Sequence, residues 1–248
     1  MGAIYIMWLR QIKKYWRSKA RIISSLAQPI LFLVALGVGL GPVFQKAGDG
    51  NYIQFLAPGI IAMAILFTAM FTGIEVIWDR QFGFLKETLV APVARTKIML
   101  GRTLGGATVA TLQGVVVLLI SLLIGFHVSN WAYFPLALVF MFAIALFFTA
   151  LGTTIGSGFR DMQAFPLVIN FIIMPLFFLS GALFPLNDLP GGIVAVTEVN
   201  PLTYGVDGLR YCLTGLGHFS VIADILVIVI VAIIMNVIGS YSFSKIQV

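Results

Sequence analysis

The chain has 248 residues, of which 60% are hydrophobic and only 10% are charged, and its mean hydropathy is +1.06. A soluble core cannot cover that much apolar surface, so the composition excludes a soluble globular protein and indicates a membrane protein. The net charge of +6 does not indicate a nucleic-acid partner, because the basic residues flank long apolar stretches.

Six apolar stretches divide the chain. They cover residues 22–44, 55–77, 105–126, 134–156, 164–184 and 221–241. Each is long enough to cross ~30 Å of hydrocarbon, which takes roughly 20 apolar residues in an α-helix. The predicted fold is therefore all-α, a polytopic membrane protein with six transmembrane helices in a single domain over residues 1–248.

Lysine and arginine are distributed unevenly around these stretches. Thirteen of the fifteen lie before the first stretch, between the second and third, between the fourth and fifth, or in the C-terminal tail. The alternate loops hold only Lys46 and Arg210, beside the acidic Asp49, Asp188, Glu198 and Asp207. By the positive-inside rule both termini are predicted to be cytoplasmic. The basic N-terminus, without a eukaryotic targeting signal or a cleavable signal peptide, suits the plasma membrane of a bacterium or an archaeon.

Residues 1–21 form a basic arm with aromatic residues at helical spacing. One face of the predicted helix carries Ile4, Tyr5, Trp8, Ile12, Tyr15 and Trp16, and the opposite face carries Arg10, Lys13, Lys14, Arg17 and Arg21. Such a helix lies in the membrane interface with its aromatic side toward the lipid. It is either a simple topology anchor or a lever that also touches a cytoplasmic partner.

The cytoplasmic segment 78–102 is predicted to contain an amphipathic helix from about Trp78 to Val90. Trp78, Phe82, Leu85 and Leu89 share one stripe of that helix. Pro92 is expected to end it, because proline removes a backbone donor and disfavours the helical conformation of Ala91. The segment either transmits a movement of a soluble partner to the membrane-spanning helices or is a solvated connector.

The outer segment 185–220 is too apolar for a free loop but carries too many charges for a full crossing. We expect two short helices, broken at Asn200-Pro201, that dip into the outer leaflet, where backbone of this kind must be buried in protein or line a wet cavity. Asp207 and Arg210 are three residues apart and can pair on a helix. The segment is either a gate or a structural plug.

Sequence motifs for chemistry are absent from the chain. There is no G-x-x-x-x-G-K-[ST] run, so the chain cannot bind a nucleoside triphosphate through a P-loop, and there is no H-E-x-x-H metal motif. The single cysteine, Cys212, excludes an intramolecular disulfide and a cysteine-based zinc cluster. G-x-x-x-G steps at Gly37–Gly41 and Gly152–Gly156 indicate close helix packing, more often within one subunit than between two.

Two runs of sequence resemble a known family. Residues 78–95, WDRQFGFLKETLVAPVAR, followed by Leu100-Gly101-Arg102, are similar to the segment after the second span of type 2 ABC transporter permeases. The run from Phe184-Pro185-Leu186 through Asn200-Pro201-Leu202-Thr203-Tyr204 to Asp207 and Arg210 resembles the signature of that family before its last span. The resemblance covers essentially the whole chain and is closest to the daunorubicin-type drug-resistance and nodulation-factor export branch.

The resemblance implies a permease subunit of an exporter for an amphipathic or lipid-like substrate, such as a drug, a lipid or a glycoconjugate. ATP and Mg²⁺ would be bound by two copies of a soluble ATPase subunit, with no cofactor in this chain, which would not itself be an enzyme. A second permease copy is expected, as a homodimer or with a paralogue. Many members carry an acidic residue at the position of Gln81 and a threonine at that of Phe84, so the side chains that touch the ATPase are not set by the resemblance.

The resemblance also assigns roles by position. The helix that couples to the ATPase would comprise Gly83, Leu85, Lys86, Glu87, Leu89 and Pro92. The extracellular re-entrant gate would be shaped by Asn200, Pro201, Tyr204, Asp207 and Arg210. Positions that line the export path or the dimer interface would be Gly37, Gly41, Asn170, Pro175 and Gly181.

Two other classes of membrane protein stay open at this stage. A secondary transporter usually places ionisable groups near the membrane midplane to bind the coupling ion. Here Glu75 lies at the cytoplasmic end of the second stretch and Asp224 near the outer end of the sixth, which disfavours that class. A membrane scaffold that transports nothing is the other alternative.

Overall fold

The structure is a computed structural model that describes residues 2–46, 51–159, 163–186 and 190–246, and every regular element in these ranges is a helix. Asp49, Arg160, Asp188 and Leu189, together with the side chain of Lys46, lie outside the described residues. The all-α prediction is confirmed for the described part of the chain.

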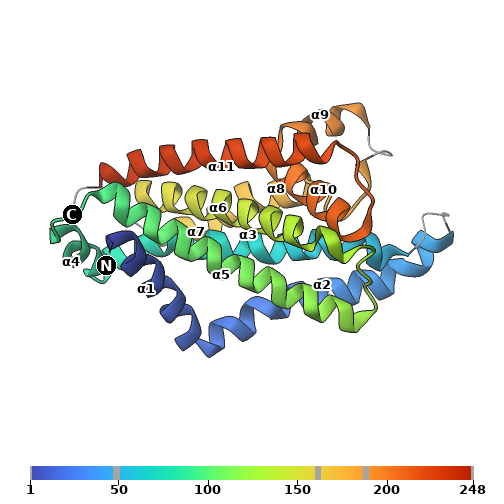
Figure 1. The fold of residues 1–248 in the computed structure, drawn as a ribbon, viewed down its shortest axis with the longest axis horizontal. Helices are drawn as coiled ribbons and strands as arrows, with labels where there is room; N and C mark the ends of the chain where they lie inside the picture. The colour runs from blue at the N-terminus through green and yellow to red at the C-terminus, as the bar shows by residue number, and fades with distance from the viewer. Residues whose placement is uncertain (1, 47–50, 160–162, 187–189, 247–248) are drawn as a thin grey trace.

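Five helices are long and apolar enough to cross a membrane. They are α2 (Lys19–Lys46), α3 (Tyr52–Gln81), α5 (Arg95–Ile124), α6 (Phe134–Gly158, preceded by the short turn η1, Trp131–Tyr133) and α11 (Val221–Ser244). They coincide with five of the six predicted stretches, and α5 begins ten residues earlier than the stretch at 105–126. The long helices run side by side as one elongated bundle (Figure 1).

The stretch at 164–184 is a shorter helical run. It consists of α7 (Ala164–Val168), the π-helical turn η2 (Ile169–Ile173) and α8 (Met174–Phe178). The apolar helix in this run, Pro166–Phe178, is shorter than a typical crossing, so the count of six crossings stays a prediction.

The core of the bundle is built around α3, which packs closely on α6. A Cβ atom at Gly73 of α3 would lie 2.5 Å from the carbonyl oxygen of Thr149, and one at Gly152 of α6 would lie 2.8 Å from that of Met70. The two backbones therefore approach as closely as only glycine allows. This agrees with the expectation that the G-x-x-x-G step at Gly152 packs helices within the subunit.

Helix α1 (Ala3–Arg17) packs on the first turns of α5. It presents Met7, Gln11 and Tyr15, and these three side chains are buried. Tyr5 and Trp16, two members of the face predicted to lie toward the lipid, are 45% and 64% exposed. Met7 and Gln11 were not part of that face, and they lie against Gly101 and Gly105 of α5, where the missing side chains let α1 approach closely.

Between α3 and α5 the chain forms the short helix α4 (Phe84–Val90). The predicted single helix from Trp78 to Val90 is wrong, because α3 ends at Gln81 and Gly83 adopts a φ of 79° before α4 begins. A left-handed backbone of this kind favours glycine and turns the chain sharply. Helix α4 ends at Val90, as the position of Pro92 predicts.

The segment before α11 forms two helices, α9 (Gly191–Val199) and α10 (Pro201–Thr214). They are separated at Asn200-Pro201, which confirms the predicted break. The two chain termini and α4 lie at one end of the bundle, and α9 and α10 lie at the other (Figure 1). We call these the terminus end and the α10 end.

Candidate functional site

At the terminus end, two basic residues of α1 face two carboxylates of α3. Lys14 donates a hydrogen bond of 2.8 Å to Glu75 and lies 4.0 Å from Asp79. Arg10, one helical turn before Lys14, lies 3.5 Å from Asp79. Residues four apart share a helix face, so the basic pair on α1 matches the acidic pair on α3 turn by turn.

Two further cations complete this group. Arg21 of α2 donates to Glu75 and, at 3.3 Å, to the hydroxyl of Thr72. Arg102 of α5 donates to Asp79, and both of these side chains are almost fully buried. We call Arg10, Lys14, Arg21, Arg102, Glu75 and Asp79 the charge cluster. It joins α1, α2, α3 and α5 at the terminus end.

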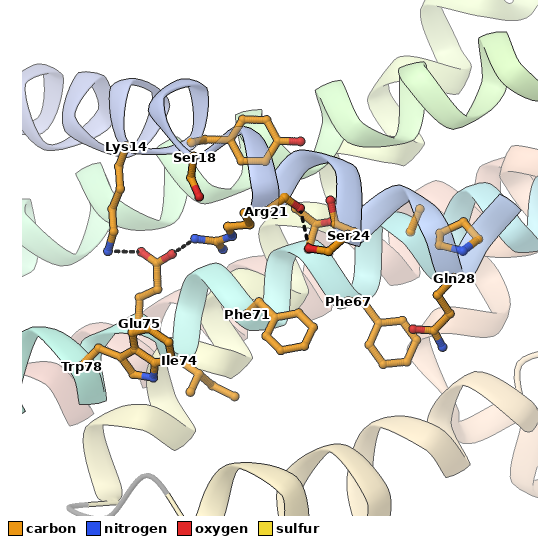
Figure 2. A pocket seen from close by; sticks show the side chains of 15 residues that line it. Lys14, Ser18, Arg21, Ser24, Gln28, Phe67, Phe71, Ile74, Glu75 and Trp78 are labelled. Carbon is orange, nitrogen blue, oxygen red and sulfur yellow. Dashed lines mark hydrogen bonds and ion pairs between the residues drawn. The ribbon is translucent and has the colours of Figure 1, made fainter. Parts of the chain in front are cut away.

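A cavity of about 590 Å³ lies beside the charge cluster, between the elbow that joins α1 to α2 and the facing side of α3. Figure 2 shows Lys14 and Arg21 reaching Glu75 from above at one side of this cavity, with Phe67 and Phe71 along its α3 wall. Tyr15 also lines it and donates a hydrogen bond to Gln113 of α5. Burial raises the pKa of the Tyr15 hydroxyl, which therefore stays neutral.

Helix α4 projects from the terminus end (Figure 1). Of the predicted coupling residues, Leu85 is fully buried and anchors the helix, whereas Lys86 and Glu87 are exposed. Phe84 and Val90 are also exposed, 52% and 84% respectively. Leu89 is half-buried, and Gly83 and Pro92 lie in the turns before and after the helix. The helix thus presents apolar and charged side chains away from the bundle.

At the α10 end, Asn200 holds the helix break in place. Its side-chain oxygen accepts from the backbone N–H of Leu202 and so caps α10, while its amide nitrogen donates to the carbonyl oxygens of Leu176 and Leu179 at 2.6 and 3.0 Å. Pro201 is the first residue of α10, where proline costs no hydrogen bond. The hydroxyl of Tyr204 donates to the carbonyl oxygen of Glu198 at 2.8 Å.

The predicted pair of Asp207 and Arg210 is present, but it is not the main contact of either side chain. Their nearest charged atoms are 3.9 Å apart. Asp207 instead accepts from the backbone N–H groups of His218 and Phe219 at 2.7–2.9 Å. The carboxylate therefore fastens the loop before α11 to the middle of α10.

Arg210 fastens α10 to two other elements. Its guanidinium donates to the carbonyl oxygen of Gly181 at 2.8 Å and to that of Phe55 at 3.4 Å. It also lies 4.1 Å above the centre of the Phe55 ring, at the beginning of α3. We call Asn200, Tyr204, Asp207 and Arg210, with their backbone partners, the α10 latch.

The five candidate positions for the export path or the dimer interface are not gathered in one place. Asn170 and Pro175 are exposed on the run from α7 to α8, and Asn170 lies in its π-helical turn. On α2, a Cβ at Gly41 would meet no atom within 4 Å, whereas one at Gly37 would lie 3.1 Å from Ile53. Gly181 is buried and has a φ of 69°. It is held in its turn by Arg210 and does not line an open surface.

The sequence does not predict the charge cluster or its cavity, because its residues lie on four helices that are far apart in the chain. The two i,i+4 pairs, basic Arg10 and Lys14 and acidic Glu75 and Asp79, were the available signal. Among the described residues, no group of three His, Cys, Asp or Glu side chains is placed to hold a metal ion.

Comparison with known proteins finds relatives that are named as transport permeases. The chain is 32% identical over 215 residues to the transport permease ycf38 of Pyropia yezoensis, a match that covers 82% of this chain and 70% of the relative. It is 29% identical to Nodulation protein J of Rhizobium meliloti (strain 1021), over 79% of this chain and 75% of the relative. It is 27% identical to the Inner membrane transport permease YadH of Escherichia coli (strain K12), over 93% and 91%. Residues 2–214 match the family model of the ABC-2 type transporter, and the chain therefore belongs to this family of membrane permeases.

Proposed function

We propose that this chain is the permease subunit of an ATP-driven exporter, with a separate soluble ATPase seated on α4. The observation that carries the proposal is the geometry of α4, a short helix anchored by the buried Leu85 that presents exposed Phe84, Lys86 and Glu87 beyond the terminus end of the bundle. A helix of this kind is tied directly to α3 and α5, so a movement of the ATPase is transmitted to both.

Helix α3 connects the two groups of polar contacts. Glu75 and Asp79 lie at one end of it, and Phe55, the partner of Arg210, lies at the other. The 20 residues from Phe55 to Glu75 span ~30 Å of helix. A displacement of α4 therefore acts first on the charge cluster and then, through α3, on the α10 latch. In this proposal the latch is the outer gate.

The complex contains two permeases, as a homodimer, and two ATPase subunits that bind ATP and Mg²⁺. The terminus end faces the cytoplasm of a bacterium or an archaeon, and the run from Ala164 to Phe178 completes the sixth crossing. The substrate is amphipathic or lipid-like. The family of the chain and the names of its relatives support transport by a permease. Glu75 is bonded to Lys14 and Arg21 and is not open to a coupling ion.

The test is co-purification of the tagged permease with its ATPase, in wild type and in Glu87→Arg. We expect the substitution to abolish binding of the ATPase, because it reverses an exposed charge on α4. Glu198→Arg makes the same change on an exposed residue of α9 at the α10 end and is expected to leave binding intact. Purification of an active transporter without any ATPase, driven by a proton gradient, would contradict the proposal.

A further inference from the structure

The cavity beside the charge cluster has two chemically different parts. Its polar side is formed by Lys14 of α1, by Arg21 of α2 and by the hydroxyl groups of Ser18 and Ser24 near the elbow. Its α3 wall carries Phe67, Phe71, Ile74 and Trp78. Figure 2 shows the charged groups together at one side and the aromatic rings spread along α3.

The charge of the polar side is positive. Glu75 is 7% exposed and already accepts from both Lys14 and Arg21. Its negative charge is therefore buried and compensated by these two cations. The side chains of Lys14 and Arg21 are 41% and 28% exposed. A lysine has three N–H donors and an arginine five, and the bonds to Glu75 and Thr72 use only some of them. Among the residues that line the cavity, two cations face one carboxylate, and Asp79, which lies 4.0 Å from Lys14, already accepts from Arg102. The site therefore favours an anion.

The apolar wall extends away from this anion site along the membrane-crossing part of α3. Phe67 and Glu75 are eight residues apart, which is ~12 Å along a helix. Phe71 and Trp78 are 43% and 50% exposed, and both side chains line the cavity. Trp78 lies at the level of the charges, where the amphipathic indole ring is favoured at a membrane interface.

We infer that this cavity binds an anionic amphipath, a molecule with a phosphate, sulfate or carboxylate headgroup and an apolar body. The headgroup contacts Lys14 and Arg21, and the apolar body lies against Phe71 and Phe67. The occupant enters from the leaflet at the terminus end. The inference concerns binding to the permease alone, so it goes beyond the proposed export function and is tested without an ATPase or ATP.

The experiment uses the full chain in phosphatidylcholine nanodiscs and phosphatidylglycerol with brominated acyl chains, which quench a tryptophan that they touch. Trp78 lines the cavity, and its signal is the difference between wild type and Trp78→Phe. We expect half-maximal quenching at about tenfold lower mole fraction of brominated phosphatidylglycerol than of brominated phosphatidylcholine, since each basic residue near an anionic lipid contributes severalfold. Equal curves for the two lipids would overturn the inference.

A triple substitution removes the anion site without leaving a buried charge. Lys14→Gln with Arg21→Gln and Glu75→Gln takes away both cations and the carboxylate between them, and it is expected to move the phosphatidylglycerol curve to that of phosphatidylcholine. Lys19→Gln, at an exposed residue of α2 that does not line the cavity, is expected to leave the curve within about twofold. An unchanged preference in the triple variant would overturn the inference.

A second variant keeps every charge. Ser24→Phe fills the cavity beside Arg21 and is expected to weaken Trp78-specific quenching by phosphatidylglycerol about tenfold. Quenching that persists unchanged would show that the lipid binds elsewhere. Inorganic phosphate at millimolar concentration is expected not to displace the lipid, because it has no apolar body to lie against Phe71. Displacement by phosphate alone would overturn the amphipath as occupant and identify a site for soluble anions.

Discussion

At the terminus end, four cationic side chains from α1, α2 and α5 surround Glu75 and Asp79 of α3, whereas at the α10 end Asp207 and Arg210 bind mainly to backbone groups. Pairs between side chains of different helices respond when whole helices shift. Bonds from a side chain to free N–H and C=O groups at helix ends respond when a turn unwinds. The first end is thus suited to receiving a rigid-body movement and the second to opening locally.

The largest effect is expected where the charge cluster is most buried. Asp79→Ala leaves Arg102, which is 2% exposed, without its carboxylate. A buried ion pair that loses one partner typically costs about 3–5 kcal/mol. The measurement is the thermal unfolding midpoint of the detergent-solubilised protein, which should fall strongly.

The matched control replaces both charges by apolar groups of similar size. Asp79→Leu with Arg102→Met is expected to recover most of the lost stability, because no uncompensated charge remains. If Asp79→Ala alone left the midpoint unchanged, the charge cluster would not hold α1, α3 and α5 together.

A smaller effect on stability, and a larger one on export, is expected at the α10 latch. Arg210→Ala removes the donor to Gly181 and the contact with the Phe55 ring, and an unsatisfied buried carbonyl costs about 1–3 kcal/mol. Asp207 keeps its bonds to His218 and Phe219. We expect co-purification with the ATPase to persist while the rate of substrate export changes.

Asp207→Ala tests the same latch from its other side. It leaves the N–H groups of His218 and Phe219 without their acceptor and should loosen the loop before α11. Export that is unchanged in both Asp207→Ala and Arg210→Ala would reduce α10 to a structural plug and remove the distinction between the two ends of the bundle.

The two ends also differ in how far the sequence predicts them. The break at Asn200-Pro201 follows from local chemistry, since proline begins a helix and asparagine caps one, and it is confirmed. The sequence did not predict the partners of Asp207 and Arg210, because the free backbone groups at Gly181 and His218 depend on where other helices end. Their spacing of three residues predicted that Asp207 and Arg210 pair with each other, but in the structure their nearest charged atoms are 3.9 Å apart.

At the terminus end, helical periodicity grouped the basic residues of α1 on one face but did not say what that face meets. Lys14 and Glu75 are 61 residues apart, and no local rule connects them. The break at Gly83 had a local signal, the glycine itself, but the apolar stripe from Trp78 to Leu89 favoured a continuous helix. Long-range pairing and single left-handed turns are thus the parts that periodicity does not determine.

The smallest effect on stability is expected at Arg10, the exposed edge of the charge cluster. The Arg10 side chain is 36% exposed and lies 3.5 Å from Asp79, which keeps Arg102 as its buried partner. Arg10→Gln should therefore lower stability by less than about 1 kcal/mol, and by less still in high salt, because solvent and ions screen such pairs. Lys13→Gln, an exposed neighbour on α1, serves as the control in the same thermal unfolding measurement. A loss for Arg10→Gln as large as that for Asp79→Ala would mean that α1, and not the buried pair between α3 and α5, holds this end of the bundle together.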